Sequence, residues 1–268
     1  GKAGEVIPAL LQPTKRGQTF VFDRRDGTPL FPIEERPAPQ QGGVEKMAPT
    51  QPWSPGFARV DRPLLRERDM WGISALDQLW CRVQFRKARY DGYFTPPGVT
   101  PSIADPGYTG GTNWGSFSVD TARQLGFTLS AQMVNYIRLI PRDDPEARGL
   151  KADSRANLGG PIGSARDLGP MRTAMHLPFT IGTPVFGGTL ATAGGLVFAG
   201  ASQDHAFRAW DSETGKLLFE ADLPGSSATR PMTYMGRDGR QYVVVASDAP
   251  AANGKQNGMI TAFALPRS

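Results

Sequence analysis

The stretch "GGTLATAGGLVFAGASQDHAFRAWDSETGKLLF", residues 187–219, decides the fold class. Short runs of alternating apolar residues are separated in it by tight-turn signals, which is typical of strands in antiparallel hairpins. One signal is Gly194-Gly195, and the other runs from Asp211 to Gly215. Glycine supplies the positive φ that such turns require. The stretch therefore predicts four consecutive strands joined by tight turns.

A second copy of part of this pattern lies near the start of the chain. Residues 18–31, "QTFVFDRRDGTPLF", match residues 205–219 in the order aromatic, strand, Asp, polar turn, Gly and strand ending in Phe. A further hairpin is predicted around Asp238-Gly239, and a last strand over residues 258–266. Repetition of a four-strand unit favours a β-propeller over a sandwich or a barrel. The predicted fold class is therefore all-β, with propeller blades.

The segment between the two copies has a different character. Residues 32–63 are rich in Pro, Gln and Gly, which predicts an extended surface loop. Residues 71–90 predict a helix because apolar side chains recur there at helical spacing. These are Ile73, Leu76, Leu79, Trp80 and Val83. We expect this apolar face to lie on the sheets; the alternative is that the basic face of the helix contacts membrane lipid.

This change in character divides the chain into three expected parts. Blade strands occupy residues 1–31, a loop and helix insertion residues 32–110, and the C-terminal blades residues 111–268.

Composition narrows the function classes. Of the 268 residues, 32 are Gly and 24 are Pro, which favours many turns over long helices. The net charge of +5 is mild and the basic residues are spread out, so nucleic-acid binding is not expected. Cys81 is the only cysteine, which excludes an intrachain disulfide and a cysteine metal cluster. The motifs of P-loop, Rossmann and nucleophile-elbow enzymes are absent from the sequence.

Three residues are candidates for a binding site. Lys15 precedes a strand and is either a solvated lysine or a cation that polarises a carbonyl or pairs with a carboxylate. Asn113 and Trp114 lie in "GGTNWG", where they are either turn and core residues or one wall of a site for a flat polar ligand. The residues alone leave both alternatives open.

Several motifs together resemble a known family, the membrane-associated quinoprotein dehydrogenases that use pyrroloquinoline quinone (PQQ). The resemblance is to the C-terminal half of the glucose and quinate/shikimate type. The motifs are "PTKRGQTFVFDRRDG", "DMWGISALDQLWCRVQFRKARYDGYFTPPG", "GGTNWGSFSVD", "GGTLATAGGLVFAGASQDHAFRAWDSETGK" and "PMTYMGRDGRQYVVV".

The resemblance implies a fold, a cofactor and partners. It implies an eight-bladed propeller with PQQ near its axis, a divalent cation (Ca or Mg) on the cofactor, and electron transfer to ubiquinone. It also implies substrate oxidation at the periplasmic face of the bacterial inner membrane, with membrane-anchoring helices upstream of this chain. The chain would then complete its propeller with an N-terminal half.

The resemblance also assigns roles to the three candidates. Lys15 matches the cationic residue that touches the quinone oxygens, Asn113 matches an asparagine that hydrogen-bonds the cofactor, and Trp114 follows beside the ring. The aspartate general base and the metal ligands of the family lie upstream. No metal ligand is therefore assigned in this chain, and we expect the chain alone to lack a full active site.

Two departures from the family pattern matter. A proline-rich stretch and a hairpin are missing between about residues 159 and 167, and we expect that a segment is omitted there because its loss would leave a strand edge unpaired. The glucose enzymes usually carry Gly-Gly-His after the "QYVVV" strand, whereas this chain has Ser247-Asp248-Ala249-Pro250. This favours quinate or shikimate as substrate over glucose or another polyol. A non-catalytic propeller module that binds a protein partner is the alternative of another class.

Overall fold

The computed structural model describes residues 4–61, 63–70, 72, 74–107, 110–112, 115–130, 134–141, 162–164, 187–200, 204–250 and 256–265. The chain divides into two compact units, and each is described by itself. Unit 1 comprises Gly1–Ala9, Gln18–Gly110 and Gln132–Thr180, and unit 2 comprises Leu10–Gly17, Gly111–Ala131 and Ile181–Ser268. The expected omission near residues 159–167 falls outside the described residues, apart from the short strand at 162–164.

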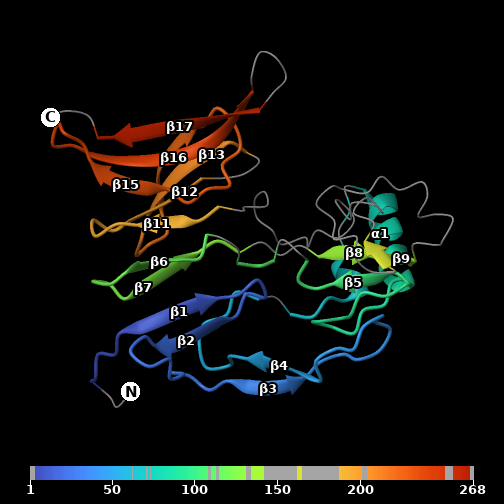
Figure 1. The fold of residues 1–268 in the computed structure, drawn as a ribbon. Helices are drawn as coiled ribbons and strands as arrows, with labels where there is room; N and C mark the ends of the chain where they lie inside the picture. Colours follow the sequence, from blue (N-terminus) through green and yellow to red (C-terminus); the bar gives the residue numbers. More distant parts are fainter. Residues whose placement is uncertain are drawn as a thin grey trace. The chain divides into compact units, whose positions relative to one another are not determined.

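Unit 2 contains the four-stranded sheet that the sequence predicts (Figure 1). Its strands follow chain order as an antiparallel meander: β11 (Thr189–Ala191), β12 (Leu196–Gly200), β13 (Ala206–Asp211) and β14 (Leu217–Asp222). Alternate side chains of β12 and β13 enter a core in which Phe207 is fully buried. The ring centroids of Phe207 and Phe263 are 4.9 Å apart. Burial of these aromatic rings stabilises the sheet against its neighbour.

That neighbour is a three-stranded sheet built from the C-terminal strands. It consists of β15 (Met232–Met235), β16 (Gln241–Pro250) and β17 (Gln256–Ala264) in chain order. The predicted hairpin at Asp238-Gly239 is confirmed, and Gly239 has a φ of 77°. The predicted last strand is also confirmed, with both ends about two residues earlier than expected.

A third sheet in unit 2 is the hairpin of β6 (Phe117–Asp120) and β7 (Leu125–Thr128). It lies beside β11 through buried hydroxyl groups. The Ser118 and Thr189 hydroxyl oxygens are 2.7 Å apart, and the Thr189 hydroxyl donates to the Phe127 carbonyl at 3.0 Å. β11 is therefore joined to both strands of this hairpin.

One turn geometry occurs three times among the residues that the structure describes. In each turn an Asp side chain accepts the backbone N–H two residues ahead: Asp23 from Arg25, Asp120 from Ala122 and Asp211 from Glu213. The residue four positions after each Asp has positive φ: Gly27 at 80°, Gln124 at 56° and Gly215 at 69°. The Asp120 copy was missed from the sequence because glutamine occupies the glycine position.

The strand predicted after Gly27 does not form. Only an isolated bridge pairs Phe22 with Pro29, although Leu30 N–H still donates to the Val21 carbonyl at 2.8 Å. Pro29 and Pro32 lack the N–H that a strand ladder requires, which explains the difference.

Unit 1 carries shorter two-stranded sheets. β3 (Glu34–Pro37) pairs with β4 (Thr50–Trp53), β5 (Ser102–Ala104) with β8 (Asn135–Ile137), and β9 (Leu139–Pro141) with β10 (Ile162–Ser164). A further two-stranded sheet joins β1 (Ala9–Pro13) and β2 (Thr19–Asp23), and the division between the units falls in this segment.

The hairpin of β3 and β4 corrects the expectation of an extended loop over residues 32–63. The Arg36 guanidinium lies 4.7 Å from the centre of the Trp53 ring, a cation–π contact within the hairpin. Pro37 and Pro52 are tolerated because a two-stranded sheet leaves edge positions that need no ladder N–H.

The predicted helix is α1 (Ala75–Lys87), preceded by the 3₁₀ turn η1 (Glu67–Asp69). Ser74 caps α1 by accepting the Asp77 N–H at 3.2 Å. The expectation that the predicted apolar face packs inward is wrong. The inward side carries Cys81, which is fully buried against Leu65, Met70, Ile103 and Val134. Ile73 lies outside the described residues.

Candidate functional site

Lys15 lies in a tight turn directly after β1. The turn is closed by the Gly17 N–H, which donates to the Thr14 carbonyl at 2.9 Å, and Gly17 has a φ of 82°. The Lys15 residue is exposed, whereas Arg16 and Gly17 are buried. The backbone of the turn is therefore fixed, and Lys15 is its exposed residue.

The "GGTNWG" stretch begins against this turn. Gly111 N–H donates to the Lys15 carbonyl. A Cβ at Gly111 would lie 3.1 Å from the Lys15 carbonyl oxygen and 3.3 Å from the Gly17 nitrogen, so the approach tolerates little beyond glycine. The structure thus brings the Lys15 turn together with the backbone that leads to Asn113 and Trp114. Those two residues themselves lie outside the described residues.

The last residue of "GGTNWG", Gly115, lies against the backbone of Gly187 and Gly188. A Cβ at Gly115 would lie 2.2 Å from the Gly187 carbonyl oxygen, and a Cβ at Gly188 would lie 2.6 Å from the Gly115 Cα. Both distances are too short for any side chain. The close approach that makes Gly111 and Gly115 necessary is therefore to this chain's own backbone, whereas the sequence suggested approach to a ligand.

Arg230 braces the strands that leave this region. Its Nε donates to the Thr189 carbonyl at 3.1 Å, and its Nη2 donates to the Phe117 carbonyl at 2.8 Å. These carbonyls belong to the first residues of β11 and β6. A charged donor to each strand fixes their spacing where Gly115 meets Gly188. Arg230 could not be identified from the sequence, because a basic residue before a strand is usually a surface residue.

Three buried hydroxyl groups of unit 2, those of Thr112, Ser212 and Ser247, have no hydrogen-bond partner among the described residues. Thr112, immediately before Asn113, is 3% exposed, and Ser247 in β16 is 5% exposed. Within the part of the chain that the structure describes, neither hydroxyl oxygen has a hydrogen-bond partner. Buried polar groups are normally satisfied, so each of these has capacity for a ligand or a water molecule. Thr112 follows Gly111, whose N–H contacts the Lys15 turn, so Thr112 belongs to the segment beside that turn.

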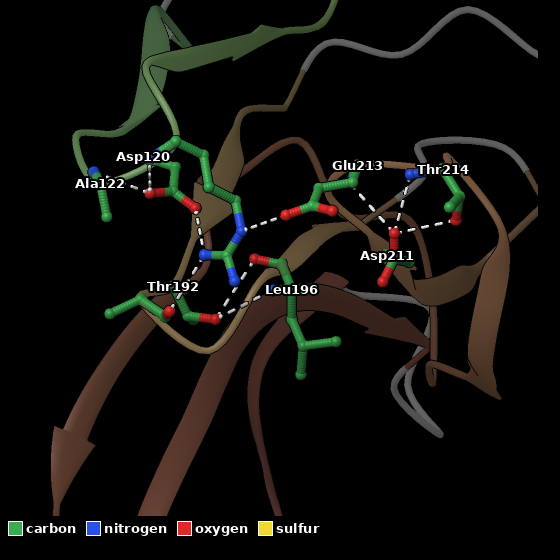
Figure 2. Close-up of polar contacts among 9 residues, drawn as sticks. Asp120, Ala122, Thr192, Leu196, Asp211, Glu213 and Thr214 are labelled. Carbon is green, nitrogen blue, oxygen red and sulfur yellow. Dashed lines mark hydrogen bonds and ion pairs between the residues drawn. The ribbon is translucent and has the colours of Figure 1, made fainter.

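A separate charged cluster joins the β6–β7 turn to the four-stranded sheet (Figure 2). Arg123 Nη1 lies 2.9 Å from the Asp120 carboxylate and 3.2 Å from the Ala193 carbonyl oxygen. Its Nε lies 2.7 Å from the Glu213 carboxylate. Hydrogen bonds from the Arg123 backbone, and from its side chain, lower the pKa of Asp120 below its ordinary value. The cluster ties two consecutive sheets together at their turns, and its connections are structural.

Neither a metal site nor a membrane span is apparent in the described ranges. No group of three or more His, Cys, Asp or Glu side chains among them is arranged to hold a metal ion. No helix among them is long and apolar enough to cross a membrane.

Comparison with known proteins identifies the family to which this chain is similar. The family model for PQQ proteins described as "Glucose/ethanol/alcohol dehydrogenase, beta-propeller domain" matches residues 1–159 and 154–243. The glycerol dehydrogenase large subunit of Gluconobacter oxydans (strain 621H) is 39% identical over 305 residues, covering 91% of this chain and 41% of that protein. The probable quinate dehydrogenase (quinone) of Xanthomonas campestris pv. juglandis is 33% identical, covering 98% of this chain and 40% of that protein.

A solved structure supports the fold. The quinohemoprotein alcohol dehydrogenase from Comamonas testosteroni aligns with a TM-score of 0.50 at 22% identity, covering 99% of this chain and 38% of that one. At this identity the likeness concerns the fold alone. The chain spans about two fifths of the length of the curated relatives that it matches.

Proposed function

The chain belongs to the PQQ-dependent glucose, ethanol and alcohol dehydrogenase family as part of its β-propeller domain, and from this premise we propose that it supplies one wall of a PQQ site. The complete protein is then a quinoprotein dehydrogenase that oxidises a hydroxyl group of a small polyol. This chain contributes the C-terminal part of the propeller, and the remaining blades come from the rest of the protein.

The observation that carries the proposal is the contact between the Lys15 turn and Gly111. The hydrogen bond from Gly111 N–H to the Lys15 carbonyl holds the accessible lysine beside the segment that contains Asn113 and Trp114. These are the residues that the family resemblance assigns to the cofactor. They would then act on PQQ from two neighbouring segments of one unit.

Each residue has a specific role in this proposal. PQQ, when bound, supplies the quinone that accepts the hydride from the substrate alcohol. The Lys15 ammonium stabilises the negative charge that develops on the quinone oxygens. Asn113 donates a side-chain hydrogen bond to the cofactor, and Trp114 packs beside its ring. The Thr112 hydroxyl, buried without a partner among the described residues, offers a further donor in the segment that leads to Asn113.

The proposed substrate is quinate or shikimate, a cyclic polyol acid. The relative named as a probable quinate dehydrogenase matches 98% of the chain. The residues after "QYVVV" also differ from the Gly-Gly-His of glucose enzymes. A neutral polyol, such as glycerol or glucose, is the second candidate, because the glycerol dehydrogenase subunit is more similar, at 39% identity.

The proposal extends to a cation, an electron acceptor and a location. A Ca or Mg ion bound mainly by the upstream blades would hold the cofactor, and ubiquinone would receive the electrons. The site would lie at the periplasmic face of the bacterial inner membrane, with anchoring helices in the part of the protein outside this chain.

The test is reconstitution of the complete protein with PQQ and Ca or Mg. Reduction of an artificial electron-acceptor dye is then measured with quinate, shikimate, glycerol and glucose as separate substrates. We expect dye reduction that depends on PQQ, with the highest kcat/KM for quinate or shikimate. The highest value for glycerol or glucose would support the neutral-polyol candidate instead.

One outcome contradicts the enzyme proposal altogether. If the folded complete protein reduces no dye with any of these substrates or with simple alcohols, the proposal fails. A propeller that only binds a protein partner would then be the better explanation.

A further inference from the structure

Arg230 uses only part of its guanidinium to hold the strands of unit 2. Its Nε donates to the Thr189 carbonyl at 3.1 Å, and its Nη2 donates to the Phe117 carbonyl at 2.8 Å. Nη1 forms no hydrogen bond with the residues that the structure describes. Since both terminal nitrogens of a guanidinium carry more than one N–H group, Nη1 and Nη2 together can still present the parallel pair of donors that binds a carboxylate.

The charge of Arg230 has no acidic partner in the part of the chain that the structure describes. In the same unit, by contrast, Arg123 and Arg208 each pair with carboxylates. Arg230 is also exposed. An exposed guanidinium that two backbone carbonyls hold in one orientation, without a carboxylate to neutralise it, has the charge and the geometry to bind an anionic group.

The position of Arg230 connects it with the "GGTNWG" stretch. Phe117, whose carbonyl accepts from Nη2, follows Trp114 by three residues. A Cβ at Gly188 would lie 3.1 Å from the Arg230 Cγ and 2.6 Å from the Gly115 Cα. The aliphatic part of the Arg230 side chain and the end of the stretch therefore lie against the same glycine.

Two cations thus belong to the two ends of one segment. Gly111, at its start, is hydrogen-bonded to the Lys15 turn, and Phe117, just beyond its end, is hydrogen-bonded to Arg230. The function proposed above assigns Lys15 to the quinone oxygens of the cofactor, which leaves Arg230 for another anionic group. The exposure of Arg230 favours a carboxylate on a substrate, which arrives from solvent, over a carboxylate on a resident cofactor.

We propose that Arg230 makes the enzyme specific for an acidic substrate by binding its carboxylate. The inference rests on the proposed function and names the residue that selects among its substrates. A cyclic polyol acid places its carboxylate on Nη1 and Nη2 of Arg230 while one of its ring hydroxyls is presented to the cofactor. A neutral polyol gains nothing from this cation, so Arg230 discriminates in favour of the acid.

The first test compares quinate with its methyl ester, which keeps the ring and the hydroxyl groups but has no charge. The kcat/KM for each is measured by dye reduction with the complete protein reconstituted with PQQ and Ca or Mg. We expect wild type to prefer quinate, and Arg230→Gln to lower the quinate-to-ester ratio of kcat/KM at least about tenfold, mainly through KM. Loss of the bracing hydrogen bonds affects both substrates alike, so the ratio isolates the carboxylate contact.

Two further variants are matched to Arg230→Gln. Arg237→Gln removes an exposed charge from the same unit and should leave the ratio as in wild type. Arg230→Lys keeps the charge but not the planar pair of donors, so its ratio should fall between those of wild type and Arg230→Gln.

The second test does not depend on turnover. Cyclohexanecarboxylate has no hydroxyl group to oxidise, so its binding to the complete protein can be measured by isothermal titration calorimetry, with cyclohexanecarboxamide as the neutral comparison. We expect wild type and Arg237→Gln to bind the carboxylate at least about tenfold more tightly than Arg230→Gln does. Arg230→Gln should bind the carboxylate and the amide equally.

Three results would overturn the proposal. An equal loss for quinate and its ester in Arg230→Gln would show that Arg230 only braces the strands. A lower PQQ affinity with an unchanged ratio would show that Arg230 holds a carboxylate of the cofactor. Equal binding of cyclohexanecarboxylate to wild type and Arg230→Gln would remove the site. If wild type reduces no dye but binds the carboxylate through Arg230, the proposed function fails and the carboxylate site stands.

Discussion

At the scale of single residues, the glycines around Asn113 and Trp114 are explained by contacts within the chain. Gly115 and Gly188 approach each other so closely that neither position has room for a Cβ. Arg230 then holds the strands that begin beside this contact. The segment that contains Asn113 and Trp114 is therefore bounded on its C-terminal side by a close backbone contact. Such a contact is sensitive to the addition of one methyl group.

Gly188→Ala tests this packing. The new Cβ would lie 2.6 Å from the Gly115 Cα and 2.8 Å from its carbonyl oxygen, so backbone must move. We expect a loss of about 1–3 kcal/mol in the free energy of unfolding, measured by urea denaturation of the complete protein. The control is Gly194→Ala, where the nearest atom is 3.9 Å away. Equal stability of the two variants would show that the backbone relaxes freely at Gly188.

At the scale of elements, each recurring Asp turn begins at the last residue of a strand, which is β2, β6 or β13. The Asp120 turn differs from the other two because Gln124 adopts a φ of 56° where the others have glycine. A side chain in this region costs free energy that glycine avoids.

Gln124→Gly is therefore expected to stabilise the protein by about 1 kcal/mol. The measurement is the urea midpoint of the complete protein. Thr121→Gly, in the same turn but without positive φ, should stabilise nothing and serves as the matched control. An unchanged or lower midpoint for Gln124→Gly would mean that contacts of the glutamine side chain outweigh the backbone strain.

The ion pair in the same turn predicts a pH dependence. The pKa of Asp120 is lowered in the folded protein, so its contribution to stability is present above the ordinary carboxyl pKa and is lost as pH falls through the lowered value. Asp120→Asn keeps a side-chain oxygen as acceptor but removes the charge that pairs with Arg123. We expect the stability difference between wild type and Asp120→Asn to be largest near neutral pH and to shrink below about pH 4.

Urea midpoints of both proteins across that range provide the measurement. A difference that stays constant with pH would mean that the Asp120 charge contributes nothing beyond the hydrogen bonds of the turn.

At the scale of the whole molecule, the sequence predicted the tight turns, because the residues within each turn determine its conformation. Gly27 and Gly215 follow aspartates in tight turns and have the positive φ that was predicted, and Gly239, in the predicted hairpin turn, has it as well. The all-β class and the propeller family follow from the strands between such turns and are confirmed. The hairpin of β3 and β4 was missed because prolines in a sequence resemble a loop when pairing partners are unknown.

Other features had no local signal. Periodicity predicted that Leu76, Leu79 and Trp80 share one side of α1, but it could not show that Cys81 and Phe85 would take the buried side. Which side of the helix packs inward depends on the shape of the surface of unit 1 on which the helix lies. That the hydroxyls of Thr112 and Ser247 are buried without partners among the described residues also emerges only from tertiary structure, because serine and threonine are common in strands and turns.

The central claim is that the Lys15 turn forms part of a PQQ site, and a PQQ titration of the complete apoprotein tests it most directly. Wild type, Lys15→Ala and the exposed control Lys46→Ala are compared by PQQ affinity and by turnover in the reconstituted enzyme. We expect Lys15→Ala to bind PQQ at least about tenfold more weakly and to lose about 100-fold in turnover, as when one charge-stabilising donor is removed, while Lys46→Ala behaves as wild type. If Lys15→Ala matches Lys46→Ala in both affinity and turnover, the Lys15 turn is not part of the cofactor site.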